Sequence, residues 1–460
     1  MSQIKRLDAS LANHLDRRKS RGTLRSLTLA SPGMADFSSN AYLSLSAQPS
    51  VRVEYLARLQ AAAALEASPA AHLSPPLLGS GGSRLLDGNS AAAEALEQTL
   101  AAFHNAPAAL LFNSAMDANV GLFSCVPQPD DAIVYDELVH ASIHDGMRLS
   151  RAGRKIPFAH NTVWIGSDGE TAPRAADRRD GEPRPLEAIL AGLLNGPGGH
   201  LFRSGDRSVF VAVEGVYSMD GDAAPLKEVT ACVQRWLPLG NGFVIVDEAH
   251  SVGVFGDRGR GLVCELGLED QVCARVLGFG KAMGCSGGLI LCSEVTRSYL
   301  INYARTLIYT TAMAFPSLLS IQVSYEFVIN GGAEPLVRHL RDLVNKTYHL
   351  LLAVCERQNP PAHLLRVSSV EPKSPIIPVF TDHPRSLASH CQRKGFMVRP
   401  IVAPTVHRGT ERIRLCLHAA NTAGEVIGIV AAIEDWLVAR MDEARRIDTL
   451  KQNAVSKSKI

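Results

Sequence analysis

Asp247 and His250 follow a short apolar run in the stretch V-I-V-D-E-A-H-S-V-G-V-F-G, which covers residues 244–256. The three β-forming residues before Asp247 indicate a buried strand that ends in a carboxylate. Because an unpaired charge is costly to bury, Asp247 needs a cationic partner. A helicase box also contains D-E-A-H, but the chain has no G-x-x-x-x-G-K-[ST] phosphate loop, so the helicase interpretation fails.

Lys281 supplies a second reactive group. It lies in G-F-G-K-A-M-G-C-S-G-G, residues 278–288, where glycines and other small residues leave room for a bulky ligand. A lysine in a partly desolvated pocket has a lowered pKa and can form a Schiff base with an aldehyde. Taken alone, Lys281 fits a solvated surface lysine better, so the assignment needs support from other residues.

Pyridoxal phosphate requires both a carboxylate and an amine as partners. Its protonated pyridine nitrogen pairs with a buried carboxylate, its aldehyde with a lysine, and its phosphate with backbone N–H groups at a helix start. Asp247 and Lys281 match the first two. Ser114 follows a predicted strand in F-N-S-A-M-D-A-N-V-G and can cap the helix that holds the phosphate. The three-part agreement predicts a pyridoxal phosphate site in which the cation beside Asp247 is a pyridinium.

An α/β fold must position these residues. Short apolar strands alternate with helical segments, which indicates a mostly parallel central sheet flanked by helices. The expected organisation is an N-terminal segment (1–47), a large cofactor-binding domain (48–320), a smaller C-terminal α/β domain (321–447) and a flexible tail (448–460). The predicted strands are 108–112, 132–135, 208–214, 243–247, 274–277 and 288–291; the predicted helices include 57–66, 91–103 and 317–356, the last broken at Gly331 and Gly332.

Bulk composition narrows the class of protein. The 460 residues are 46% hydrophobic and 20% charged with a net charge of +2, which is typical of a soluble globular protein and implies no nucleic acid partner. No apolar run reaches the ~18–20 residues of a membrane-spanning helix, and residues 1–10 lack a signal-peptide core. Nine scattered cysteines without a C-x-x-C pair fit reduced thiols inside a cell and no metal cage.

The C-terminal tripeptide Ser458-Lys459-Ile460 differs from the peroxisomal address S-K-L by one residue. A frayed polar tail explains the same residues equally well. The sequence therefore predicts an intracellular protein of the peroxisome or the cytoplasm.

A series of motifs follows in order along the chain from Phe37 to about Leu437: F-S-S-N-A-Y-L-S-L-S, G-S-G-G-S-R, S-A-M-D-A-N, H-A-S-I-H-D-G, E-G-V-Y-S-M-D-G-D-A-A-P-L, D-E-A-H-S-V-G-V-F-G, F-G-K-A-M-G-C-S-G-G, A-R-T-L-I-Y-T-T-A-M and A-P-T-V-H-R-G-T-E-R-I-R-L. This series resembles the α-oxoamine synthases, which are fold-type I pyridoxal phosphate enzymes of the class II aminotransferase family. The resemblance implies a fold-type I enzyme with pyridoxal 5'-phosphate as cofactor.

The resemblance also implies roles for the core residues. Lys281 would form the Schiff base and move the substrate Cα proton, and Asp247 would pair with the pyridine nitrogen. His250 would bond the phenolic oxygen of the cofactor, and His140 would stack on its ring. Alone, His140 would be a capping or core histidine; a zinc pair with His144 lacks the glutamate and third ligand of metalloproteases.

By the same resemblance, the start of a helix would bind the phosphate of the cofactor. Ser114 and the backbone of Ala115 and Met116 would hold it. Thr310 or Thr311 would reach the same phosphate from a second subunit, so the resemblance implies a homodimer with shared active sites.

The substrate side is implied in the same way. Arg414 would clamp the carboxylate of the amino acid in a bidentate fork, with Asn40 beside it. Ser218 would lie near the cofactor ring, and Glu214 would support that loop. Arg412, two residues before the clamp, is expected to be a surface arginine.

Four positions depart from the family pattern. They are Gly278 in place of threonine, Ala41 in place of aspartate, Ala93 in place of histidine and Met116 in place of an aromatic residue. None belongs to the catalytic core, so the chemistry should survive. The departures bear on substrate fit and phosphate affinity.

The implied reaction is a decarboxylative condensation of an amino acid with an acyl-CoA to an α-aminoketone. C-S-G-G-L-I-L-C-S and A-R-T-L-I-Y-T-T-A-M look closest to the branch that joins L-alanine to pimeloyl-CoA in biotin biosynthesis, which we favour. S-A-M-D-A-N-V-G-L-F leans toward the glycine-using 2-amino-3-oxobutyrate CoA ligases. A polyketide-releasing enzyme of secondary metabolism and an inactive scaffold paralogue are also compatible with the sequence.

Overall fold

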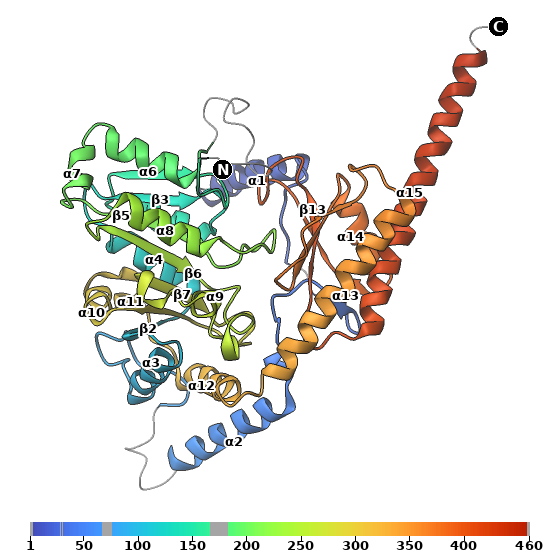
Figure 1. Ribbon diagram of the computed structural model, residues 1–460. Coiled ribbons are helices and arrows are strands. Elements are labelled where there is room, and N and C mark those ends of the chain that lie inside the picture. The colour runs from blue at the N-terminus through green and yellow to red at the C-terminus, as the bar shows by residue number, and fades with distance from the viewer. Residues whose placement is uncertain (1–2, 28, 30, 67–75, 166–182, 458–460) are drawn as a thin grey trace.

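The computed structural model describes residues 3–27, 29, 31–66, 76–165 and 183–457. Its largest sheet has seven strands, in the order β2-β8-β7-β6-β5-β3-β4 (Figure 1). Along the chain these strands are β2 (Ala108–Phe112), β3 (Ala132–Asp136), β4 (Arg154–Phe158), β5 (Val209–Glu214), β6 (Gly242–Asp247), β7 (Ala274–Gly278) and β8 (Gly288–Cys292). All six predicted strands of this sheet are present, and β4 is an additional edge strand.

The sheet is mixed. Strands β3 to β7 are parallel to one another, whereas β8 runs antiparallel to both β7 and β2. Since parallel strands end at the same edge, β5, β6 and β7 present their carboxyl ends together, and ligands bind at this edge in open α/β sheets.

Helices cover both faces of this sheet. Buried residues of α4, α5, α10 and α11 form one apolar cluster with inward-facing strand residues such as Leu110 and Ile245. Alternate residues of the same strands, such as Leu111 and Val246, belong to a second cluster on the other face. The helices of this part are α2 (Pro49–Glu66), α3 (Ala91–Phe103), α4 (Ala115–Cys125), α5 (Ala141–Leu149), α6 (Leu186–Asn195), α7 (Gly199–Arg203), α8 (Leu226–Trp236), α9 (Leu262–Leu266), α10 (Glu294–Tyr303), α11 (Arg305–Ile308) and α12 (Phe315–Ile329).

A four-stranded antiparallel sheet follows later in the chain, in the order β12-β13-β10-β9. The helices α13 and α15 lie side by side along it, and α14 packs against α15 (Figure 1). The elements are α13 (Glu334–Gln358), β9 (Arg366–Val367), β10 (Ile376–Phe380), α14 (Pro384–Arg393), β12 (Arg399–Ile401), β13 (Arg412–Cys416) and α15 (Ala423–Lys457). The predicted break at Gly331 and Gly332 is confirmed, because the chain turns there between α12 and α13.

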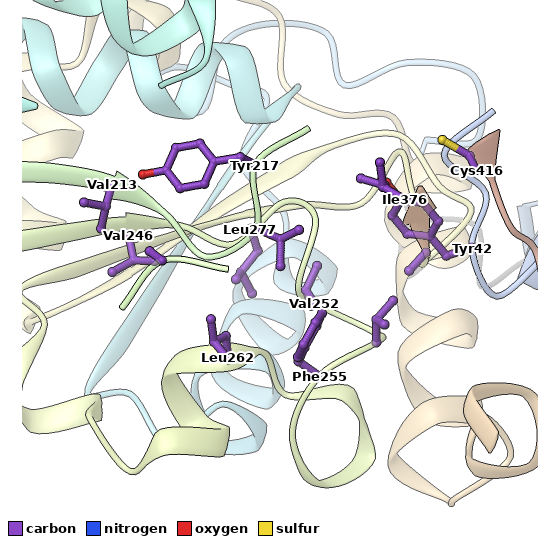
Figure 2. Packing of buried hydrophobic residues seen from close by; sticks show 14 of the residues in the cluster. Tyr42, Val213, Tyr217, Val246, Val252, Phe255, Leu262, Leu277, Ile376 and Cys416 are labelled. Carbon is purple, nitrogen blue, oxygen red and sulfur yellow. The ribbon is translucent and has the colours of Figure 1, made fainter. Parts of the chain in front are cut away.

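The segment before α2 is attached to this second sheet. Strand β1 (Ala35–Asp36) pairs in parallel with β11 (Phe396–Met397). The backbone N–H of Cys416 donates to the carbonyl of Phe37 at 2.9 Å, and that of Ala419 donates to the carbonyl of Tyr42 at 2.7 Å. Figure 2 shows Tyr42 packed beside Ile376 and Cys416 in the shared core. The predicted domain boundaries at 47/48 and 320/321 stay predictions.

The two ends of the chain carry long helices. Helix α1 (Gln3–Ser20) buries none of its side chains. Helix α15 continues to Lys457, and the flexible tail expected over 448–460 stays a prediction. The tripeptide Ser458-Lys459-Ile460 lies outside the described residues. No helix among the described residues is long and apolar enough to span a membrane.

Candidate active site

Two buried carboxylates lie next to each other at the carboxyl edge of the seven-stranded sheet. Asp247 ends β6, Glu214 ends β5, and the two residues are partners in the register of this parallel pair. They are 6% and 3% exposed. Burial, reinforced by the negative charge of Asp247, raises the pKa of Glu214 well above its usual value. The raised pKa favours the protonated form of Glu214.

The carboxylate of Asp247 meets neutral donors. Its Oδ1 accepts from the backbone N–H of Ala249 at 2.9 Å, and its Oδ2 accepts from Asn119 Nδ2 at 2.6 Å. No lysine, arginine or histidine among the described residues lies within 4 Å of it in an ion pair. A buried carboxylate without a protein cation fits an external cation such as a protonated pyridine nitrogen.

Asn119 and Ser142 connect Asp247 to His140. The amide of Asn119 also donates to Ser142 Oγ at 3.0 Å, and that hydroxyl donates to His140 Nδ1 at 2.7 Å. His140 caps α5 by accepting from the backbone N–H of Ser142, and its own backbone N–H donates to Glu214. We call Asp247, Asn119, Ser142 and His140 the single-sheet network, because elements around one sheet supply all of it. The ring of His140 is left exposed and available for stacking on a ligand.

Lys281 lies in the turn between β7 and β8, at the same edge of the sheet. Burial lowers the pKa of its amine below the usual value; the carboxylates of Asp247 and Glu214 oppose this shift, and the charge of Arg414 adds to it. Such an amine is neutral more often than a surface lysine, which is the state needed to attack an aldehyde or accept a proton.

The first turn of α4 presents unpaired backbone N–H groups at its start. The hydroxyl of Ser114 accepts from the backbone N–H of Asp117 at 3.0 Å, which leaves the N–H groups of Ala115 and Met116 without intrahelical partners. Gly278 lies beside it: a Cβ there would be 2.9 Å from the Cβ of Ala249 and 3.3 Å from that of Ala115. A side chain at position 278 would therefore fit only if Ala249 or Ala115 moved.

Thr310 and Thr311 lie near this helix start in the same chain. Asn113 Nδ2 donates to Thr310 Oγ1 at 3.4 Å and to the carbonyl of Thr311 at 2.8 Å. Their predicted reach into a second subunit stays a prediction.

His250 lies at the same edge of the sheet, but the residues that hold it come from the smaller sheet and from the segment before α2. Its Nδ1 lies 2.7 Å from the hydroxyl of Tyr42, which is also 3.3 Å from Asn40 Oδ1. Arg414 NH2 donates to the same Asn40 oxygen at 3.0 Å. We call Arg414, Asn40, Tyr42 and His250 the two-sheet network, because β13 of the smaller sheet and the residue pair before α2 meet β6 of the larger one.

The loop 215–224 joins both sheets. Arg414 NH1 donates to the carbonyl of Ser218 at 2.7 Å, and Arg412 forms an ion pair with Asp220. The predicted surface position of Arg412 is wrong, since this residue is only 3% exposed and its guanidinium stacks on Phe380. Side chains alternate along a strand, so Arg412 and Arg414, two positions apart, must share one face.

The structure thus brings one group of predicted residues to one edge of the sheet: Asn40, Ser114, Ala115, Met116, His140, Ser218, Asp247, His250, Lys281 and Arg414. Asn119, Ser142 and Tyr42 were not among the residues predicted from the sequence. Asn119 could have been found from the sequence, because a polar residue inside a helix that packs on the sheet needs a hydrogen-bond partner. Their roles, like those of the predicted residues, stay proposals. Among the described residues no cluster of three or more His, Cys, Asp or Glu side chains could hold a metal ion.

Comparison with known proteins places these observations in a family context. A family model described as aminotransferase class I and II matches residues 32–433. An 8-amino-7-oxononanoate synthase of Emericella nidulans is 48% identical over 430 residues, which cover 93% of this chain and 95% of the relative. An aminoacyl transferase sphA of Aspergillus fumigatus is 35% identical and covers 87% of this chain and 80% of its own length.

Solved structures share the fold. A serine palmitoyltransferase of Sphingomonas wittichii matches with a TM-score of 0.73 at 22% identity, over 95% of this chain and 99% of the other. An 8-amino-7-oxononanoate synthase of Francisella tularensis matches with a TM-score of 0.64 at 22% identity, over 89% and 100% of the two chains. The predicted fold class, a mostly parallel sheet flanked by helices, is confirmed.

Proposed function

The chain belongs to the α-oxoamine synthases of the aminotransferase class I and II family, which are pyridoxal-phosphate-dependent acyltransferases, and we propose that it joins L-alanine to pimeloyl-CoA. The product would be 8-amino-7-oxononanoate, a precursor of biotin. The observation that carries this proposal is the 48% identity, over 93% of the chain, to a protein named for that reaction.

The site residues fit pyridoxal phosphate. Asp247 is a buried carboxylate without a protein cation, Lys281 is a partly desolvated amine, and the start of α4 offers free N–H groups. When bound, the cofactor supplies an aldehyde that captures the amino group of the amino acid and a ring that takes up electron density from its Cα.

Each site residue would then have a separate role in the reaction. Arg414, whose guanidinium is oriented by Ser218 and Asn40, would bind the carboxylate of the amino acid. Lys281 would accept the Cα proton, since its lowered pKa favours the neutral amine. Asp247 would keep the pyridine nitrogen protonated, and the exposed ring of His140 would cover the cofactor.

The reaction balances without an oxidant or a reductant. A bond forms between Cα and the carbonyl carbon of the thioester, and the C–S bond breaks to release coenzyme A as the thiol. The carboxylate leaves as carbon dioxide, and a proton returns to Cα. The products are an α-aminoketone, coenzyme A and carbon dioxide.

A second candidate is supported by the 35% identity to the Aspergillus fumigatus aminoacyl transferase. In that case the chain would be an α-oxoamine synthase of secondary metabolism that transfers a different acyl chain. The glycine-using reaction remains a third, less supported choice.

The decisive experiment is a panel of L-alanine, glycine and L-serine against pimeloyl-, acetyl- and palmitoyl-CoA, scored for carbon dioxide and free thiol. We expect release with L-alanine and pimeloyl-CoA, and a loss on the order of 10²–10³-fold in D247N, which keeps the shape of Asp247 but removes its charge. Turnover with glycine and not alanine would overturn the substrate proposal. A protein that never gains a visible absorption band with pyridoxal phosphate would support the inactive scaffold.

We further propose that the chain acts as a homodimer whose subunits share active sites through Thr310 or Thr311. We also propose that the protein is located in the peroxisome or the cytoplasm. Light scattering after size exclusion measures the first point. Localisation of a fluorescent fusion with and without Ser458-Lys459-Ile460 measures the second, and unchanged localisation would remove the peroxisomal interpretation.

A further inference from the structure

The hydroxyl of Tyr42 is the centre of the two-sheet network. Tyr42 is fully buried, and its oxygen lies 2.7 Å from His250 Nδ1 and 3.3 Å from Asn40 Oδ1. A phenol has one proton, so it can donate to only one of these two acceptors. The shorter distance is that of a normal hydrogen bond, and the longer one is beyond the usual range for a hydroxyl donor.

The protonation states of both partners limit the possible arrangements. Burial lowers the pKa of His250 well below its usual value, and the neighbouring charges of Lys281 and Arg414 act in the same direction. Burial also raises the pKa of Tyr42 well above its usual value. The pair therefore consists of a neutral imidazole and a neutral phenol, and a neutral imidazole has one donor and one acceptor nitrogen.

Asn40 has its own donor. Its Oδ1 accepts from Arg414 NH2 at 3.0 Å, so it does not need the proton of Tyr42. No other described residue donates to His250 Nδ1. The proton of Tyr42 therefore points to Nδ1, and the proton of the imidazole must be on Nε2.

Resting on the proposed function, we propose that Tyr42 is a positioning residue that fixes His250 as the tautomer with its N–H at Nε2. That N–H is then the donor that the cofactor's phenolic oxygen needs. The oxygen of Tyr42 also lies 3.3 Å from Asn40 Oδ1, the atom that accepts from Arg414, so the proposed cofactor and amino-acid sites adjoin here.

The main test is Y42F, studied as the holoenzyme without substrate. Loss of the donor frees His250 to adopt the other tautomer, which leaves the phenolic oxygen without an N–H and makes it more basic. We expect the pH midpoint of the cofactor's absorption band to rise by about one pH unit, the size of one hydrogen bond to an ionised group. With substrate, we expect kcat to fall on the order of 10-fold with the KM for the amino acid within about 3-fold, because Arg414 keeps Asn40.

The chain offers a matched control in Tyr325. This tyrosine is also buried, and its hydroxyl lies 3.1 Å from Nε2 of the buried His104; neither residue belongs to the two networks. Y325F removes the same group from the same kind of pair. It should change stability as Y42F does but leave the band midpoint and kcat unchanged.

A shift in Y42F no larger than in Y325F would overturn the inference. If Y42F does not fold, ¹⁵N-histidine NMR of the wild-type holoenzyme, with H250N for assignment, reads the tautomer directly. A proton on Nδ1 of His250 would refute the assignment. A wild-type protein that binds no pyridoxal phosphate would instead refute the proposed function, so the two failures are distinguishable.

Discussion

The single-sheet network and the two-sheet network flank the same catalytic edge, but they are assembled differently. Asp247, Asn119 and His140 come from β6, α4 and the start of α5, which all pack on one sheet. Arg414 and Asn40 are 374 positions apart and meet only where the smaller sheet contacts the larger one. The network that would hold the cofactor is therefore local, whereas the network that would hold the substrate depends on how two sheets fit together.

The largest effect is expected where both networks meet, at Lys281. K281A should lower turnover on the order of 10⁴-fold, since it removes the proposed proton acceptor, while pyridoxal phosphate still binds through Asp247 and α4. The melting temperature should not fall, because the partly desolvated amine of Lys281 destabilises the wild-type protein. Carbon dioxide release and circular dichroism measure the two outcomes. Retention of a tenth of the activity would contradict the assignment.

The contact between the sheets should be the next most sensitive feature. R412A breaks a buried ion pair with Asp220 and should lower the free energy of unfolding by about 3 kcal/mol in urea titrations. It should also raise the KM for the amino acid, because the loop 215–224 holds Arg414. R357A, which removes an exposed pair with Glu434, is the control and should change neither value. Equal losses of unfolding free energy in both variants would show that the ion pair of Arg412 stabilises the protein no more than an exposed pair does.

The ionisation of His160 provides a pH-dependent test of the loop 215–224. Burial opposes ionisation, but hydrogen bonds to Asp136 and Asp222 outweigh it and raise the pKa of His160 to about 10. Because this pKa is raised above the unfolded value of about 6.5, the stabilisation is complete below pH 6.5 and is lost as pH rises toward 10.

We expect a difference of about 2 kcal/mol between wild type and H160Q at pH 6.5, and a difference near zero at pH 10, from urea unfolding at both values. The figure is reduced from the full shift because the His160 side chain is partly exposed. A difference that stays constant with pH would disprove the linkage.

The smallest effect is expected inside the single-sheet network. S142A removes the hydroxyl between Asn119 and His140, but His140 Nδ1 still accepts from the backbone N–H of residue 142. Turnover should fall about 10-fold with an unchanged KM. S124A, which removes a hydroxyl bonded only to a helix carbonyl, should have no effect on steady-state kinetics. A change in KM for S142A would show that the two networks are not separate.

The sequence predicted the strand ends on the single-sheet side of the site, although it did not show Asn119 and Ser142. Strands that end in Asp247 and Glu214 are continuous apolar runs, so their ends and their polar residues are visible without a structure. The missed strand β4 contains an arginine, a lysine and a proline, which an edge strand tolerates and a central one does not. The antiparallel direction of β8 was not predictable either, because an apolar run carries no direction.

Long-range contacts explain the remaining errors. The resemblance suggested a role for Asn40, but nothing in the sequence shows that Tyr42 reaches His250 across 208 positions. Arg412 was assigned to the surface, although its spacing from Arg414 already required both side chains to lie on one face of β13. Burial of Arg412 is then a consequence of the loop that covers that face.

The pairing of Asn40 with Arg414 also sets an order of events during protein synthesis. A ribosome delivers Asp247 and Lys281 long before it reaches β13, so the nascent chain acquires the groups proposed for vitamin capture first. The arginine proposed for amino-acid recognition emerges after these residues and must then pair with Asn40, which was made before them. A chain that ends before β13 would lack Arg414 and, with it, the proposed clamp for the amino acid.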